Sequence, residues 1–280
     1  QMHSISNSLD IETSFIEDDE INPFAVETES VLSLVTPSGT ISTNFRNEYN
    51  LFLRSGFRSA LNTTVALAGT DIAIDNSTNE ITSSVTALDT SGIEVGQYLK
   101  VTSTTNGVAY VKITVIATNQ LDYVGTLVTE AAGATINLDG TSLTNGTTLT
   151  GIALEKRISA SVFQLYLGNV VNSFNFNIGI GSNITTDFEM MGLSRTVTTT
   201  TNSTGSVLPV PTTSKKFNTV NNVSQFTLGG VDIKNTLCPE SLSFAINNNT
   251  SQEPCVGFNT PQEIGSGTAQ MTGEFSIFYI

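Results

Sequence analysis

The chain of 280 residues has no Trp, one His and two Cys, and each scarcity removes a class of function. The single histidine is His3, in the N-terminal segment that is expected to lie outside the core. One histidine there cannot supply a His-based catalytic triad or a His-rich metal site. Cys238 and Cys255 form no CxxC motif. Whether they pair stays open, and a reduced cytoplasmic site of assembly is the simpler interpretation. No apolar run approaches the roughly 18 residues of a membrane span, so we expect no membrane partner.

Charged residues are also scarce, at 13% of the chain, which is about half the usual share. Thr, Ser and Asn take their place, and these residues suit strands and turns. Apolar residues make up 39% of the chain and include 15 Phe, which is enough for a packed core. The sequence therefore predicts an all-β fold.

The charge that is present is mostly negative, with a net charge of −14. Residues 1–30 hold eight acids and no cation, and residues 64–150 hold eight acids against Lys100 and Lys112. The rest of the chain is balanced. A protein that grips phosphate needs a basic stripe, and none is present.

The first part of the chain predicts an arm, two strands joined by a turn, and a helix, in that order. Residues 1–30 are acidic and irregular, typical of an extended arm outside the core. A strand at 30–35, a turn at Pro37-Ser38-Gly39 and a strand at 40–45 follow. Apolar residues then recur at helical spacing within 48–57, which predicts a short amphipathic helix.

Residues 64–147 consist of short segments with alternating apolar residues and predict a small β domain inserted into a larger one. Thr- and Asn-rich linkers bound the segment, and turn residues recur inside it every eight to twelve positions. The strands expected there are 71–74, 80–84, 98–103, 110–117, 120–123 and 134–138. The larger domain then comprises 31–63 and 148–280.

After the insertion, longer strands return at 148–157, 162–171, 173–180 and 184–192. The pair covering 173–192 alternates apolar and polar residues and predicts a hairpin with one dry and one wet face. A long Thr/Ser/Pro loop at 196–218 contains Pro209 and Pro211, and strands at 242–246 and 270–279 close the chain.

Few residues suggest chemistry. Asp187 and Glu189 share the wet face of a strand at about 7 Å, a spacing compatible with a glycosidase pair, but a solvated face explains them more simply. The acids at 18–20 lack the alternate spacing of a calcium loop, and Gly265-Ser266-Gly267 lacks the Lys and helix of a phosphate loop. We therefore predict no enzyme, cofactor or metal.

The C-terminal region carries the most specific motifs. A strand ending in Asn247-Asn248 is followed by a loop with Gly257, an IGSG turn at 264–267 and a TGEF strand at 272–275. In this order they resemble the phage tail-tube family. Residues 154–157 and 167–173, the strand and helix of 40–57, and 93–101 with 127–133 resemble further parts of that family. Two features depart from its pattern: members commonly continue past the TGEF strand, and the acidic arm is not part of it.

The resemblance implies a β-sandwich flanked by a helix and a structural role in the virion tail. Subunits of such proteins form rings, usually of six, that are assembled in the host cytoplasm and stack into a hollow tube. The expected partners are further copies of the chain and other tail proteins, and genome DNA passes through without specific binding. The inserted domain is expected on the outer surface.

The hairpin at 173–192 is the best candidate for the wall of the bore. Its apolar residues, at alternate positions, must face the core, so its polar residues would point into the bore. The candidate lumen-facing residues are Asn175, Asn177, Thr185, Asp187 and Glu189. Two alternatives stay open: the hairpin faces outward or packs between subunits, or the chain is an Ig-like adhesin, carbohydrate-binding or virion decoration module. The lack of Trp weakens the carbohydrate-binding alternative.

Overall fold

The computed structural model describes residues 4–16, 30–46, 49–59, 65–85, 87–140, 143–202, 216–220, 222–223, 227–228, 231–232 and 237–279. The chain divides into two compact units. Unit 1 comprises Gln1–Arg58 and Thr147–Ile280, and unit 2 comprises Ser59–Gly146. The sequence predicts 64 and 147 as the bounds of the inserted segment.

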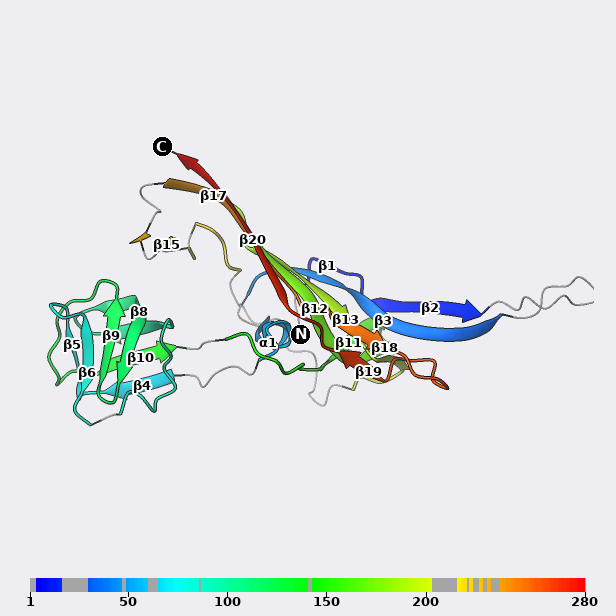
Figure 1. Ribbon diagram of the computed structural model, residues 1–280, viewed down its shortest axis with the longest axis horizontal. Coiled ribbons are helices and arrows are strands. Elements are labelled where there is room, and N and C mark those ends of the chain that lie inside the picture. The colour runs from blue at the N-terminus through cyan, green and yellow to red at the C-terminus, as the bar shows by residue number, and fades with distance from the viewer. Residues whose placement is uncertain are drawn as a thin grey trace, which may run out of the picture. The chain divides into compact units, whose positions relative to one another are not determined.

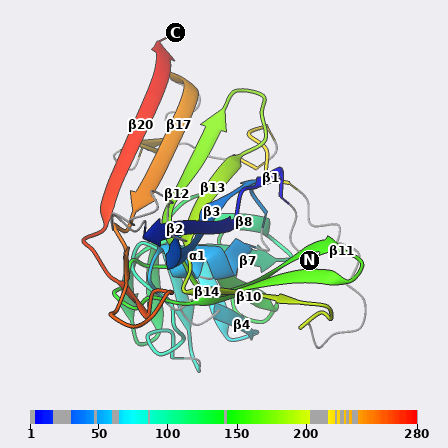
Figure 2. The same ribbon diagram turned by 90° about the vertical axis from the view of Figure 1, so that its right-hand side faces the viewer.

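Unit 1 is built from antiparallel strands and one short helix (Figures 1 and 2). Its main sheet has the order β1-β3-β13-β12-β17-β20, with β2 added to β3 and with β11 and β14 added to β12. The elements are β1 (Ser6–Asn7), β2 (Asp10–Ile16), β3 (Val31–Asn44), α1 (Asn50–Gly56), β11 (Ile152–Ser159), β12 (Val162–Gly179), β13 (Thr185–Met191), β14 (Ser194–Thr198), β15 (Thr227–Leu228), β16 (Val231–Asp232), β17 (Leu237–Asn247), β18 (Ser251–Glu253), β19 (Glu263–Gly265) and β20 (Gln270–Tyr279). The all-β prediction with one short helix is confirmed.

Strand β12 belongs to two layers of unit 1. Its first half pairs with β11 and β14, and its second half pairs with β13 and β17. The change falls at an irregularity between Val171 and Ser173, where the side chain of Asn172 accepts hydrogen bonds from the N–H and the hydroxyl of Thr250. The sequence pattern predicts two strands here, 162–171 and 173–180, because the irregularity interrupts the apolar alternation of one continuous strand.

The core of unit 1 lies between these layers and α1. Phe174, Phe188 and Ile246 from the main sheet pack with Tyr166 and with Phe52 of the helix. Helix α1 approaches the sheet closely, since a Cβ placed on Gly56 would lie 2.5 Å from the ring of Phe174. This contact fixes which face of the sheet is dry.

The N-terminal segment differs from the arm predicted for residues 1–30. Strands β1 and β2 pair with β3, and Leu9 between them is buried in the core. The carbonyl of Leu9 accepts hydrogen bonds from the hydroxyl of Tyr166 (3.2 Å) and the ammonium of Lys156 (2.9 Å). Sequence reasoning missed this because residues 1–30 were treated as one acidic segment, although six of their eight acids lie at 17–29 and only Asp10 and Glu12 lie within 4–16. Residues 17–29 of the predicted arm lie outside the described residues.

Strand β3 runs straight through the turn predicted at Pro37-Ser38-Gly39. Pro37 lies where the pairing with β13 ends, and its carbonyl accepts a hydrogen bond from the N–H of Gly192. Such an end position tolerates the missing N–H of proline. Gly39 is required by a close crossing rather than by a turn, because Leu9 passes directly over it.

The predicted loop at 196–218 begins later than expected, since β14 continues to Thr198. Residues 203–215, which include Pro209 and Pro211, lie outside the described residues. Cys238 and Cys255 are both free. Within the described ranges no helix is long and apolar enough to span a bilayer.

Unit 2 is a seven-stranded antiparallel sheet with the order β4-β10-β7-β8-β9-β6-β5, coiled around its own apolar core. Its strands are β4 (Val65–Gly69), β5 (Ile72–Asp75), β6 (Glu80–Ser83), β7 (Tyr98–Ser103), β8 (Gly107–Ala117), β9 (Gln120–Val124) and β10 (Ile136–Gly140). Every strand expected from the alternation pattern is present, and β4 is additional. The units therefore have separate cores.

Candidate functional surface

The five candidate residues share one face of the β12–β13 hairpin. Asn175 pairs with Asp187 and Asn177 pairs with Thr185, while Glu189 lies opposite Ser173. Because residues paired across antiparallel strands point to the same side, these side chains form one continuous surface.

This surface extends over three further strands as a grid of three rows. Each row crosses β3, β13, β12, β17 and β20 in that order. The first row is Thr40, Glu189, Ser173, Asn247 and Gln270. The second row is Ser42, Asp187, Asn175, Ala245 and Thr272, and the third is Asn44, Thr185, Asn177, Ser243 and Glu274. We call these 15 residues the polar face, since only Ala245 lacks a polar side chain.

Hydrogen bonds within the polar face hold some of its side chains in place. The hydroxyl of Ser173 donates to the carboxylate of Glu189 at 2.6 Å. The side-chain oxygen of Asn175 accepts from the N–H of Asp187 at 3.0 Å. The surface is hollowed around these residues, and the hollow is also lined by Thr40, Ser42 and Asn247.

The charge of the polar face is of one sign. Asp187, Glu189 and Glu274 are carboxylates, and none of the 15 residues is Lys or Arg. The remaining polar groups are hydroxyls and amides. Such a surface repels phosphate and offers it no cation to bind.

Sequence reasoning found only the part of this surface that lies on one hairpin. It missed the contributions of β3, β17 and β20, including Glu274. A signal was available, because polar residues alternate at 270, 272 and 274 within β20. Which strands lie side by side, however, depends on long-range pairing that local alternation does not specify.

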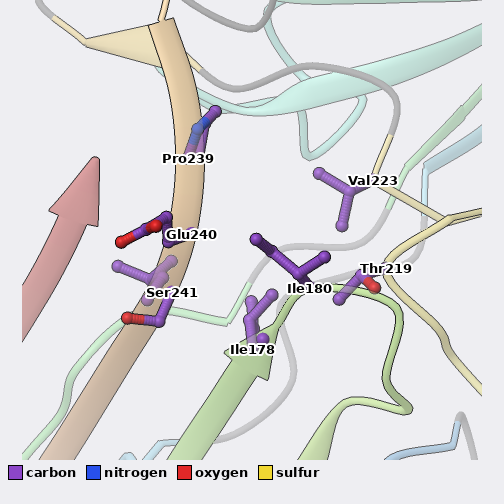
Figure 3. Close-up of a pocket in the computed structure, with 9 residues that line it drawn as sticks. Ile178, Ile180, Thr219, Val223, Pro239, Glu240 and Ser241 are labelled. Carbon is purple, nitrogen blue, oxygen red and sulfur yellow. The ribbon is translucent and has the colours of Figure 1, made fainter. Parts of the chain in front are cut away.

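A second surface feature is an apolar pocket at the end of β12 (Figure 3). Ile178 and Ile180 lie between Val223 on one side and Pro239 of β17 on the other. The rest of the lining is Gly179, Thr219, Glu240, Ser241 and Leu242. Ile180 is 69% exposed, so the pocket displays apolar surface to solvent.

The opposite end of the sheet exposes apolar side chains too. Figure 1 shows β2 and the first part of β3 projecting as a long ribbon from the rest of unit 1. Phe15, Ile16 and Val31 near its outer end are each more than half exposed. Because β3 runs from this ribbon to Asn44, which pairs with Thr185 of β13, the ribbon and the pocket lie at opposite ends of the strands.

The sequence profile described as phage tail tube protein matches residues 8–280. The chain belongs to the phage tail tube family. It is accordingly a structural component of the phage tail, as the motifs at 247–275 predicted. A search of curated proteins finds no match.

Membership of the tail tube family favours the non-enzymatic interpretation of Asp187 and Glu189. Both lie on the polar face, and the carboxylate of Glu189 is hydrogen-bonded to Ser173. Among the residues that the structure describes, no group of three His, Cys, Asp or Glu side chains is arranged to hold a metal ion.

Proposed function

We propose that six copies of the chain close into a ring, that rings stack into a tube, and that the polar face lines the bore through which genome DNA passes. The observation that carries this proposal is the polar face itself, with its three carboxylates and no cation. On β3, β13, β12 and β17 its reverse side is already covered by helix α1 and the core, so on these strands it is the polar side that is free to line a channel.

The edges of the main sheet support closure into a ring. Strand β20 ends the order at one side, and β1 and β2, which both pair with β3, end it at the other. Open edges expose unpaired N–H and C=O groups and invite pairing with another chain. Pairing of one copy's β20 side with the next copy's β1–β3 side removes the edges and forms a continuous barrel.

The charge pattern suits the passage of DNA. Carboxylates repeated around the bore repel the phosphate backbone, while hydroxyls and amides offer only weak, exchangeable contacts. The DNA is therefore kept off the wall and meets no site that holds it.

Reversing the charge of two face residues tests the proposal. Particles whose tail tube carries Asp187→Lys and Glu189→Lys should assemble but release DNA slowly or not at all, because each ring would present cations to passing phosphates. The measurement is the rate of triggered DNA release, with negative-stain microscopy to verify the tails.

A matched control is the pair Glu253→Lys and Glu263→Lys, two carboxylates that face each other across β18 and β19. This variant makes the same change of charge away from the polar face and should release DNA normally. Normal release from particles that carry the substitutions at 187 and 189 would remove the hairpin from the lumen.

The two apolar ends of the sheet supply a contact between rings. The ribbon of β2 and β3 on one copy would insert Phe15, Ile16 and Val31 toward the pocket of Figure 3 on a copy in the next ring. Such a head-to-tail contact uses different surfaces on the two partners and repeats without closing, as a growing tube requires.

The position of unit 2 on the outside of the tube is also part of this proposal. It has a core of its own and takes no part in the polar face. A bore wide enough for DNA has no room for a folded unit from every subunit, so the outer surface is the place that accommodates it. The proposal also includes assembly of the tube in the host cytoplasm, together with other tail proteins.

A further inference from the structure

The chain contains two Asn-Gly sequences, and the structure places them in different environments. Asn106-Gly107 lies at the hairpin between β7 and β8, and Asn145-Gly146 lies in the connection that leads from unit 2 back to unit 1. Asn is a chemically labile residue, and a following glycine has no Cβ to keep its backbone nitrogen away from the Asn side chain. Each sequence is therefore a candidate for spontaneous loss of the side-chain amide.

The side chain of Asn106 is held at both of its polar atoms. Its oxygen accepts a hydrogen bond from the N–H of Val128 at 2.6 Å. Its nitrogen donates to the carbonyl of Val128 at 3.1 Å and to the carboxylate of Glu130 at 3.0 Å. Turning this amide toward the nitrogen of Gly107 would break these bonds, so the fold protects the first Asn-Gly sequence.

Asn145 has a different environment. It is exposed and lies outside every strand and helix of the structure. Within the described part of the chain, no hydrogen bond joins its side-chain amide to another residue. The amide can therefore turn toward the backbone nitrogen of Gly146 without loss of a described contact.

We propose that Asn145 is a site of spontaneous deamidation to aspartate and isoaspartate. Hydroxide removes the N–H proton of Gly146, and the nitrogen attacks Cγ of Asn145 to form an N–Cγ bond. The Cγ–Nδ2 bond breaks, and ammonia leaves with a proton taken from water, which returns the hydroxide. Water then opens the resulting succinimide at either carbonyl, so the new carboxylate lies in the side chain as aspartate or in the main chain as isoaspartate.

The modification changes the connection between the units and neither core. Residues 140–154 contain no charged residue, so deamidation places a carboxylate in an uncharged stretch. Isoaspartate also routes the main chain through the side-chain carbon and lengthens it. Residue 145 belongs to neither hydrophobic core, so both units should stay folded. This inference does not depend on the role of the polar face.

Peptide mapping by mass spectrometry after incubation of the purified full chain tests the proposal. The peptide that contains Asn145 should gain the mass of deamidation, and the peptide that contains Asn106 should not. An isoaspartyl methyltransferase should label the aged protein, because direct hydrolysis of the amide would give aspartate alone. The reaction should run faster at pH 9 than at pH 6, since hydroxide starts it.

Gly146→Ala is the first control, and it should slow deamidation of Asn145 by about tenfold because a methyl group hinders the attacking nitrogen. Gly146 does not have a positive φ, so alanine fits its backbone. Incubation in urea is the second control. Both Asn-Gly sequences should then react at similar rates, because the hydrogen bonds of Asn106 are lost.

Three results would overturn the proposal. The first is a folded chain in which Asn145 stays unmodified. The second is equal rates at Asn145 and Asn106 in the folded chain, which would mean that the hydrogen bonds of Asn106 give no protection. The third is an unchanged rate in Gly146→Ala, which would exclude attack by the nitrogen of residue 146.

Discussion

Single residues in unit 1 are constrained by close backbone crossings, and Gly39 is the clearest case. Its φ is +151°, and a Cβ at this position would lie 2.5 Å from Cα of Leu9. The obstacle is backbone, so rotation of a side chain cannot relieve it.

Gly39→Ala should therefore displace the N-terminal strand and lower the free energy of unfolding by about 3 kcal/mol. Denaturant titration measures the loss, and limited proteolysis should show faster cleavage near residue 9. Gly151→Ala is the control, since the atom nearest to its Cβ would be 3.9 Å away. Equal stability of the Gly39 variant and the parent would mean that the crossing adjusts easily.

The carboxylate of Glu130 in unit 2 accepts several hydrogen bonds. The hydroxyl of Ser103 and the side-chain amide of Asn106 donate to it, as do groups of Thr105. These bonds, that of Ser103 foremost, hold the pKa of Glu130 below its ordinary value of 4.5. The carboxylate form is therefore more favourable in the folded state than in the unfolded state.

A lowered pKa adds stability that is present above pH 4.5 and is lost as the pH falls through the folded-state value. Glu130→Gln should accordingly lower the melting temperature of unit 2 at pH 7, and the difference from the parent should shrink at pH 3. Calorimetry of the full chain measures both. Glu80→Gln on β6 is the control. If the difference in melting temperature between Glu130→Gln and the parent were the same at pH 7 and pH 3, the hydrogen-bonded carboxylate would not be its cause.

At the scale of elements, local patterns predicted strands well and their partners poorly. The strands of unit 2 follow from alternation because they are short and half-buried. In β12 the same reasoning produced two strands, since the irregularity at Asn172 shifts the parity. In β3 the same reasoning predicted a turn, because Pro37 and Gly39 are typical turn residues. In the structure Gly39 instead lies under the backbone of Leu9, and the strand continues.

The candidate site shows the same division. Asn175, Asp187 and Glu189 lie on one hairpin, where the alternation of a single stretch of sequence places them together. Glu274 and Thr40 lie far away in the chain, and only the pairing of β20 and β3 into the sheet brings them to the same face. Leu9 escaped prediction because the apolar residues at 5, 9, 11, 15 and 16 do not keep the two-residue spacing of a half-buried strand.

The pocket at the end of β12 leads to a prediction about ring stacking. Ile180→Asp places a charge in an apolar contact and should shorten or abolish tubes while leaving the subunit folded. Val256→Asp, at a fully exposed position (103%), is the control and should leave tubes unchanged. Tube length by negative-stain microscopy is the measurement, and normal tubes from the Ile180 variant would exclude the pocket as a ring-to-ring contact.

At the scale of the whole molecule, the two connections to unit 2 begin side by side. The carbonyl of Arg58 accepts a hydrogen bond from the N–H of Thr148 at 3.0 Å. The chain therefore leaves unit 1 after Arg58 and has returned to it by Thr148, at neighbouring positions joined by this hydrogen bond.

Deletion of residues 60–146 with a short Gly/Ser link should leave unit 1 folded and able to form tubes. The expected tubes are thinner, because the proposed outer layer is missing. Circular dichroism checks the fold and microscopy measures the tubes. If unit 1 stayed folded but formed no tubes, unit 2 would be part of the wall.

The continuity of β12 has a mechanical consequence. One strand of 18 residues is shared by both layers of unit 1, so a force on either layer reaches the other through covalent bonds. Sliding one layer past the other must shear one half of the strand from its two partners, and loads shared by many parallel bonds resist shear far better than bonds broken one at a time. A tail built on this strand would bend as an elastic rod, with its stiffness set inside each subunit as well as at the contacts between subunits.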